Sequence, residues 1–292
     1  MNGRLDSYFA LTKPGVVILL QITGICAVIA HDLLEAGGLS GNTARTISVV
    51  LVGGYLTAGG ANSINMWYDR DIDPLMSRTS GRPIPAGEIP PLSALVFGIV
   101  MSLLGTLWLY VMANPVASFW ACFSVLFYVF IYSIWLKRTS PQNIVIGGIA
   151  GSTPPLVGWS ASEQSLDIST DSLQSMLESV TDIGSMMPWL MFFIIFLWTP
   201  PHFWALALYK SKEYGKVGVP MMPNVKGKSR TMLEMKVYAV ALMVVSFYTP
   251  IANGHLDDSS RIFHLLRWSC ILLSAWYAST VWRIDILSLI HI

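Results

Sequence analysis

Residues 62–85 hold the side chains best suited to chemistry and read NSINMWYDRDIDPLMSRTSGRPIP. This stretch follows a long apolar run and places three aspartates, three arginines and two asparagines within 24 residues. If a helix continues as far as Asp73, then Asn62, Asn65, Asp69 and Asp73 fall within about 80° of one another around its axis. The spacing therefore predicts a row of oxygen-bearing side chains along one face of a helix end.

This row of side chains is typical of a site for a divalent cation. Two carboxylates four residues apart on a helix repel each other, and their burial near a bilayer is costly. Mg²⁺ relieves both problems, because it takes oxygen ligands and commonly bridges one or two carboxylates to a substrate phosphate. The guanidinium groups of Arg78 and Arg82, just downstream, suit the same phosphate. We therefore expect a Mg²⁺–diphosphate site at this end of the helix; a plain solvated loop would not need this spacing of acids.

A second polar cluster lies in residues 196–223, FLWTPPHFWALALYKSKEYGKVGVPMMP. His202 stands inside an apolar stretch, and helical periodicity places Tyr209 and Glu213 on its face, with Lys210 beside them. An ionisable residue within a membrane helix is a functional candidate, although a buried histidine with satisfied hydrogen bonds is the plainer alternative. We expect the two clusters to face each other across one site, with nearby aromatic rings able to stabilise a cation.

The composition indicates the type of secondary structure that must position these clusters. Of 292 residues, 53% are apolar and 12% are charged, and the mean hydropathy is +0.56. Soluble domains carry about 25% charged residues, so the sequence indicates an all-α membrane protein. The net charge of +1 argues against nucleic-acid binding, and the three cysteines lack the spacing of metal ligands.

Apolar stretches long enough to cross a membrane recur along the chain. A span needs about 20 mostly apolar residues. Eight stretches qualify: 14–30, 46–68, 92–112, 115–136, 141–159, 187–209, 232–252 and 263–284. The fifth contains Gly147, Gly148, Gly151 and the pair Pro154-Pro155, so we expect it to be kinked.

The basic residues predict the orientation of these spans. All but Arg45, Arg261 and Arg267 of the 18 Lys and Arg residues fall on one side. By the positive-inside rule, this side, with both termini and both polar clusters, is cytoplasmic. The N-terminus has no features of a cleaved signal peptide or an organelle transit peptide, which favours a bacterial inner membrane. Residues 160–186 carry five acids and no base, and form an outward loop with room for a short amphipathic helix.

Together, these motifs resemble the UbiA superfamily of intramembrane prenyltransferases. The likeness rests on NMWYDRDIDPLMSRTSGRPIPAG and WTPPHFWALALYKSKEYGKVGVPMMP. Within these, RTSGRPIPAG and WTPPHFWALA are typical of one branch, the heme O synthases or protoheme IX farnesyltransferases. The likeness extends over nearly the whole chain, from YFALTKPGVV onward.

The resemblance implies a UbiA-like bundle of nine helices and a single prenyltransferase domain over residues 1–292. The implied reaction joins farnesyl diphosphate to a vinyl group of heme B, with addition of water, and gives heme O. Mg²⁺ is the implied cofactor. The implied partners are the lipid bilayer, which both substrates share, and a heme A synthase or a terminal oxidase.

The resemblance also implies the site residues. They are Asn62, Asn65, Asp69, Asp73, Arg78, Arg82, His202, Lys210 and Glu213. By matching positions, Asn65, Asp69 and Asp73 would hold Mg²⁺ and the diphosphate. Lys210 and Glu213 would belong to a second motif on the diphosphate side, and the remaining four match polar positions important in the branch.

Some features depart from the family pattern. Glu213 stands where an Asp is usual, and Met66 stands where many members outside this branch carry a further Asp. The chain ends in RIDILSLIHI, as if another apolar segment had begun, so we expect a C-terminally truncated chain without the ninth helix.

Three other functions remain open on the sequence alone. The chain could be a prenyltransferase of the same fold that acts on an aromatic quinone precursor, a polytopic transporter, or a heme-binding assembly protein without catalysis. The motif around His202 argues against the first, the position of both clusters at one membrane face argues against the second, and the aspartate pair argues against the third.

Overall fold

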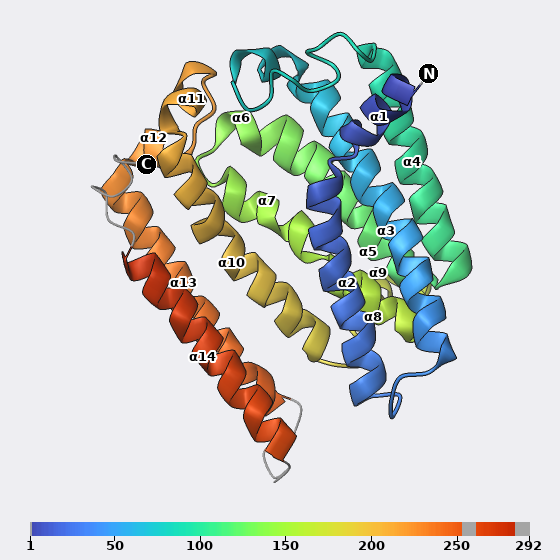
Figure 1. Cartoon of the computed structure of the whole chain (residues 1–292). Coiled ribbons are helices and arrows are strands. Elements are labelled where there is room, and N and C mark those ends of the chain that lie inside the picture. Colours follow the sequence, from blue (N-terminus) through green and yellow to red (C-terminus); the bar gives the residue numbers. More distant parts are fainter. Residues whose placement is uncertain (1, 253–260, 284–292) are drawn as a thin grey trace. The chain divides into compact units, whose positions relative to one another are not determined.

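The computed structural model describes residues 2–252 and 261–283, and every regular element in these ranges is a helix (Figure 1). The predicted all-helical fold is confirmed. The chain divides into two compact units, residues 1–135 with 149–185 and residues 136–148 with 186–292. Each unit is described by itself.

Unit 1 is built around a long helix, α3, which packs on α2, α4, α5 and α8. Four of its helices begin with a proline, which suits the first helical turn because the missing N–H would have no partner there. The elements of unit 1 are α1 (Asn2–Leu11), α2 (Pro14–Leu34), α3 (Gly41–Tyr68), the 3₁₀ turns η1 (Asp69–Asp71) and η2 (Asp73–Leu75), α4 (Pro91–Met112), α5 (Pro115–Leu126), most of the π-helix η3 (Phe127–Leu136), α8 (Pro154–Ser162) and α9 (Leu173–Thr181).

Unit 2 consists mainly of α10 packed on α13 and α13 packed on α14. Its elements are α6 (Lys137–Thr139), the start of α7 (Asn143–Ser152), α10 (Met187–Tyr209), α11 (Ser211–Lys216), α12 (Met222–Lys226), α13 (Lys228–Ala252) and α14 (Arg261–Arg283). Where α10 packs on α13, Trp204 is fully buried and lies edge-on against Tyr238, with ring centroids 5.7 Å apart.

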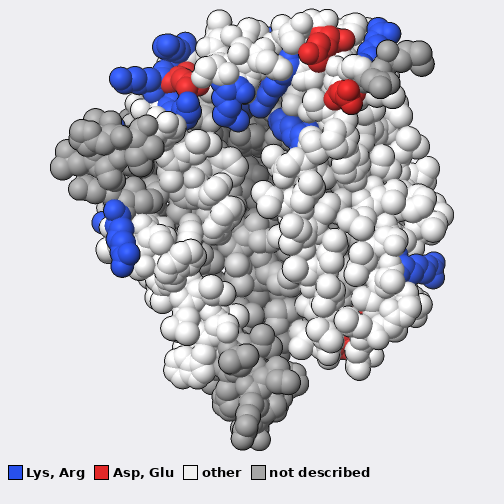
Figure 2. Space-filling view, in the orientation of Figure 1, with Lys and Arg blue, Asp and Glu red and all other residues white. Residues whose placement is uncertain are grey.

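Six helical segments are long and apolar enough to cross a membrane. They are Pro14–Leu34, Gly41–Asp71, Pro91–Met112, Pro115–Thr139, Met187–Tyr209 and Lys228–Thr249, as counted over the described residues. Figure 2 shows uncharged side chains over most of the face in view, as expected for helices in lipid. The chain is therefore a multi-pass membrane protein.

The sequence also makes predictions for the fifth and eighth spans, the outward loop and the end of the chain. The predicted span 141–159 is broken, because α7 ends at Ser152 and α8 begins at Pro154, so the predicted kink is confirmed. The eighth predicted span corresponds to α14, which is not among the six. The predicted short helix of the outward loop is α9. The expectation about the end of the chain falls on residues 284–292, outside the described residues.

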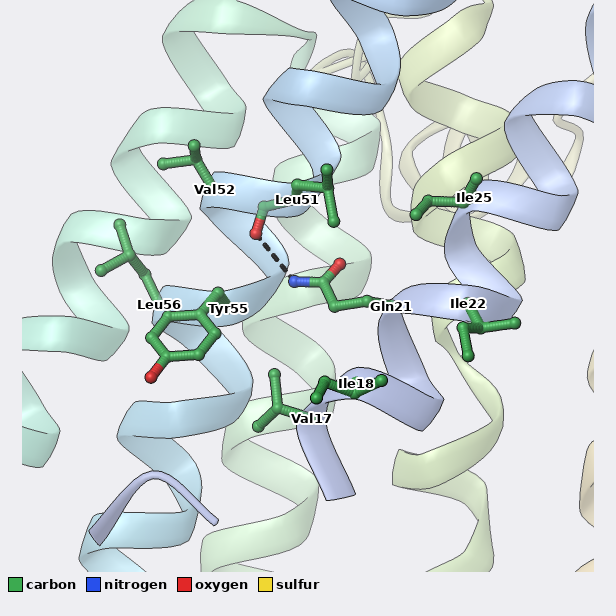
Figure 3. Close-up of a pocket in the computed structure, with 9 residues that line it drawn as sticks. All are labelled: Val17, Ile18, Gln21, Ile22, Ile25, Leu51, Val52, Tyr55 and Leu56. Atoms are coloured by element: carbon green, nitrogen blue, oxygen red, sulfur yellow. Dashed lines mark hydrogen bonds between the residues drawn. The ribbon is translucent and has the colours of Figure 1, made fainter. Parts of the chain in front are cut away.

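An apolar groove lies between α2 and α3 on one side of unit 1 (Figure 3). It has a volume of about 530 Å³ and is lined by Val17, Ile18, Gln21, Ile22, Ile25, Leu51, Val52, Tyr55 and Leu56. Gln21 Nε2 donates to the backbone oxygen of Leu51 (2.7 Å), so its amide nitrogen has a partner within the wall. Because no Asp, Glu, Lys, Arg or His lines this groove, the chemistry of the two polar clusters must lie elsewhere.

Glycines bring α3 and α4 into close contact. A Cβ atom at Gly60 would lie 2.6 Å from Gly98 O and closer still to Ser102 Oγ, and one at Gly98 would lie 2.8 Å from Gly60 O. Small residues allow this approach of backbones, which stabilises helix pairs in membranes where the hydrophobic effect between helices is weak. The contact holds α3, and so the polar residues at its end, against a second long helix.

We predict that Gly60→Ala destabilises the protein by about 1–3 kcal/mol, because the added methyl group overlaps backbone atoms of α4. Thermal unfolding in detergent measures this effect as a lower midpoint. Gly15→Ala is the matched control, since Gly15 is also helical and has no atom within 4 Å of its Cβ position. Equal midpoints for the two variants would contradict the importance of the contact.

Candidate functional site

The polar residues of the first motif lie where α3 ends and a tight turn begins. The prediction of one α-helix as far as Asp73 is wrong, because α3 ends at Tyr68. The Ile72 amide then donates to Asp69 O (3.0 Å) and the Met76 amide donates to Asp73 O (3.3 Å), which is the hydrogen-bond pattern of 3₁₀ turns. Pro74, which has no N–H, favours this break in the helix.

Both aspartates of the motif are buried, and each has a specific partner. Asp69 has no exposed surface, and its Oδ2 accepts a hydrogen bond from Asn65 Nδ2 (3.0 Å). Asp73 is 2% exposed, and its two carboxylate oxygens accept bonds from Arg82 Nη1 (2.8 and 2.7 Å). Asp71, between them, is exposed. The structure thus pairs Asn65 with Asp69 and Asp73 with Arg82, whereas Arg78 lies exposed on the loop.

Lys13 also reaches this motif, which the sequence analysis missed. Its Nζ donates to Asn65 Oδ1 (2.7 Å), across 52 positions of the chain. Among the described residues, Lys13 is the one non-glycine residue with a positive φ, 52°. Such a backbone is strained, and strained residues concentrate at functional sites. The one signal in the sequence was a Lys-Pro pair just before the first apolar stretch.

The strained turn at Lys13 is held by α3. Asn62 Nδ2 donates to the backbone oxygen of Thr12 (3.1 Å), and the hydroxyl groups of Thr12 and Tyr55 lie within hydrogen-bonding distance of each other (3.0 Å). Asn62 therefore supports the turn that carries Lys13. It is one helical turn from Asn65, but the bond it makes is not to an aspartate of the motif.

The segment η3 supplies another residue that the sequence analysis missed. Asn65 Nδ2 donates to Ser133 Oγ (3.1 Å), and Ser133 is buried. Ser133 Oγ in turn donates to Tyr128 O (2.9 Å), and the ring of Tyr128 stacks on that of Tyr132 with centroids 5.3 Å apart. No sequence signal singled out this serine.

The second polar cluster lies in unit 2. His202 is exposed on α10 and stacks on Trp198 with ring centroids 4.3 Å apart. Lys210 Nζ donates to Glu213 Oε1 (2.8 Å). His202 and Tyr209 lie seven positions apart in the same helix, α10, as predicted. The prediction that Glu213 shares their helical face is wrong, because α10 ends at Tyr209 and Glu213 belongs to α11. Since the two clusters belong to different units, their meeting across one site stays a prediction.

The donors of the first cluster fit a hard cation that also binds phosphate. Asn65, Asp69 and Asp73 offer amide and carboxylate oxygens, and Lys13 and Arg82 place two positive charges beside them. In the part of the chain that the structure describes, no group of three or more His, Cys, Asp or Glu side chains is placed to hold a metal ion. A cation here would therefore need water or phosphate oxygens as further ligands, as Mg²⁺ commonly does.

The sequence matches the model of the UbiA prenyltransferase family over residues 23–288. Curated relatives include the protoheme IX farnesyltransferase of Parvibaculum lavamentivorans, which is 38% identical over 97% of this chain and 80% of its own length. That of Gluconacetobacter diazotrophicus is 43% identical over 82% of this chain and 68% of its own length. That of Chloroflexus aurantiacus is 40% identical over 95% of this chain, which spans 42% of that relative.

Solved structures share the fold. A UbiA homologue from Archaeoglobus fulgidus bound to DMAPP and Mg²⁺ superposes with a TM-score of 0.65 over 94% of this chain and 86% of its own, at 15% identity. A digeranylgeranylglyceryl phosphate synthase superposes with a TM-score of 0.66 over 99% of this chain and 98% of its own, at 18% identity. The fold is therefore UbiA-like.

We predict that Arg82→Met lowers the free energy of unfolding by about 3 kcal/mol, because the buried Asp73 carboxylate loses its ion pair. Chemical or thermal unfolding in detergent measures this change. Arg78→Met is the control: Arg78 is exposed on the same loop, and its replacement should change stability by no more than about 0.5 kcal/mol. A similar loss in both variants would show that the pair with Asp73 is not the cause.

Proposed function

Because this chain belongs to the UbiA prenyltransferase family, in its protoheme IX farnesyltransferase branch, we propose that it transfers a farnesyl group from farnesyl diphosphate to a vinyl group of heme B, with addition of water, to give heme O. The observation that carries the proposal is the pair of buried carboxylates at the end of α3, next to an amide oxygen, Lys13 and Arg82. The relatives named above support the choice of substrates.

We assign the metal and diphosphate to the first cluster. Asn65, Asp69 and Asp73 would hold Mg²⁺, which when bound neutralises charge on the leaving diphosphate. Lys13, Arg82 and Arg78 would bind phosphate oxygens as charge-assisted donors. Asn62 has a supporting role, since it fixes the turn that carries Lys13.

In the proposed reaction the bond between C1 of the farnesyl group and its diphosphate oxygen breaks, and its electron pair leaves with the diphosphate. Positive side chains placed beforehand stabilise this growing negative charge. The electron-rich vinyl group of heme then forms the new carbon–carbon bond to C1. The cation left beside the porphyrin takes up water and loses a proton. An apolar, aromatic surrounding protects the allylic cation from early capture by water.

We assign the second cluster to the same reaction. Lys210 and Glu213 would belong to the diphosphate side, and their mutual ion pair would hold Lys210 in place. His202, with its ring exposed beside Trp198, would contact the heme through its propionates or its iron, or accept the final proton. This assignment requires both units to act as one prenyltransferase domain, an arrangement supported by the family match over residues 23–288.

We further propose eight spans, with both termini and both clusters on the cytoplasmic side of a bacterial inner membrane. The six candidate spans, the broken pair α7–α8 and α14 together support this number. The distribution of Lys and Arg supports the orientation. The product would pass within the membrane to a heme A synthase or a terminal oxidase.

The activity test uses purified protein, heme B, farnesyl diphosphate and Mg²⁺, with mass spectrometry to detect hydroxyethylfarnesyl heme. We predict product from the unchanged chain and none after EDTA. Asp69→Asn should lower the rate about a hundredfold or more, because a ligand oxygen and a negative charge are lost. Asp71→Asn is the matched control, since Asp71 is exposed in the same turn, and should retain most of the activity.

Two results would contradict the proposal. Full activity of Asp69→Asn would overturn the metal role assigned to Asp69. Transfer of the prenyl group to 4-hydroxybenzoate, without any heme product, would establish a prenyltransferase of quinone precursors instead.

The orientation can be tested by cysteine labelling in spheroplasts, after replacement of Cys26, Cys122 and Cys270 by Ala. We predict that a membrane-impermeant maleimide labels Gln174→Cys, on α9, in intact spheroplasts. Ser80→Cys, on the exposed loop after η2, should react only after permeabilisation. The reverse pattern of labelling would overturn the orientation and leave the site assignment untouched.

A further inference from the structure

The segment η3 (Phe127–Leu136) is wound as a π-helix for ten residues. Ser133 shows this winding directly, because its hydroxyl donates to Tyr128 O, five residues back. In an α-helix a serine hydroxyl bonds to the carbonyl three or four residues back. π-helical segments are usually single turns and often lie at functional sites. A π segment of this length beside buried aspartates therefore suggests a specific task.

The winding keeps one face of the α5–η3 helix turned toward α3. Val125 and Val129 form a buried cluster with Ala61 of α3. Four residues further along each helix, Ser133 meets Asn65. Positions four apart drift by about 40° in an α-helix. A π-helix has more than four residues in each turn, so in η3 the drift over four positions runs in the opposite sense and returns Ser133 toward the face that faces α3.

Ser133 completes the hydrogen bonding of the Asn65 amide. Asn65 Oδ1 accepts from Lys13 (2.7 Å), and Asn65 Nδ2 donates to Asp69 (3.0 Å) and to Ser133 (3.1 Å). Lysine can only donate and an ionised carboxylate can only accept, so these two partners determine which end of the amide is oxygen. Without the Ser133 hydroxyl, one buried N–H of Asn65 would lose its partner and the amide would be held less firmly.

We propose that Ser133, presented by the π-helical segment η3, is a positioning residue that fixes the side chain of Asn65 so that its carbonyl oxygen is turned toward the metal and diphosphate. The inference rests on the proposed function, in which Asn65 is a metal ligand. It predicts that the Ser133 hydroxyl strengthens metal binding although Ser133 itself does not touch the metal.

The test compares Ser133→Thr with Ser133→Val, which have the same shape and differ only in the hydroxyl group. Mn²⁺ serves as the probe, because it accepts the same oxygen ligands as Mg²⁺, and electron paramagnetic resonance measures its binding to the purified protein without substrates. We expect Ser133→Val to bind Mn²⁺ about five- to tenfold more weakly than Ser133→Thr. Ser133→Ala, which adds no volume, should repeat the loss if the larger side chains do not fit.

Two controls separate positioning from a general packing defect. Ser118→Ala removes another buried hydroxyl of the same helix, one that donates to Thr106 O (2.9 Å), and should leave Mn²⁺ affinity unchanged. In an Asn65→Ala background, Ser133→Val should cause no further loss, because the side chain that it positions is absent. An equal additional loss in that background would show that Ser133 acts by another route and would overturn the inference.

Asp69→Asn distinguishes failure of this inference from failure of the proposed function. If Asp69→Asn weakens Mn²⁺ binding while Ser133→Thr and Ser133→Val bind Mn²⁺ equally well, the assigned metal site is supported and the positioning role of Ser133 is wrong. If Asp69→Asn leaves Mn²⁺ binding unchanged, the assigned metal site is wrong, and the inference is overturned with it.

Discussion

Two negative charges buried at the end of an apolar helix are the constraint on which the rest of unit 1 depends. An unpaired carboxylate in this place would be strongly destabilising. Asp69 is held by an amide from the last turn of α3, and Asp73 is held by an arginine from the following loop. For Arg82 to return to Asp73, the chain must leave the helix axis, so the end of α3 at Tyr68 is part of how the charge is accommodated.

The partners of these carboxylates come from segments far apart in the chain, and the packing of α3 brings them together. Its glycine contacts with α4 support α3 closely on one side. The turn before α2 contributes Lys13, and η3 contributes Ser133. All these residues belong to unit 1. The geometry around Asn65 therefore depends on the packing of one compact group of helices, and the proposed function additionally assigns roles to residues of unit 2.

The sequence predicted the helical membrane fold and the contact of polar side chains at the end of α3, because hydropathy and the four-residue spacing report directly on lipid contact and helical faces. The spacing held within α3, where Asn65 meets Asp69, and failed beyond it, where Pro74 and the 3₁₀ turns carry Asp73 off that face. Lys13 and Ser133 were not predictable, since they are 52 and 68 positions from Asn65. The apolar run FYVFIYSIWL does not distinguish a π-helix from an α-helix, because both bury similar side chains.

The position of these contacts along the chain has a consequence for biosynthesis. The bonds among Lys13, Asn65, Asp69, Asp73, Arg82 and Ser133 all join residues that the ribosome makes before it reaches α10. Chains fold from the N-terminal side as they are synthesised, at about 5–20 residues per second. The aspartates therefore have their partners within reach while the second half of the protein is still being translated, and the nascent chain need not hold uncompensated charge at the membrane until synthesis ends.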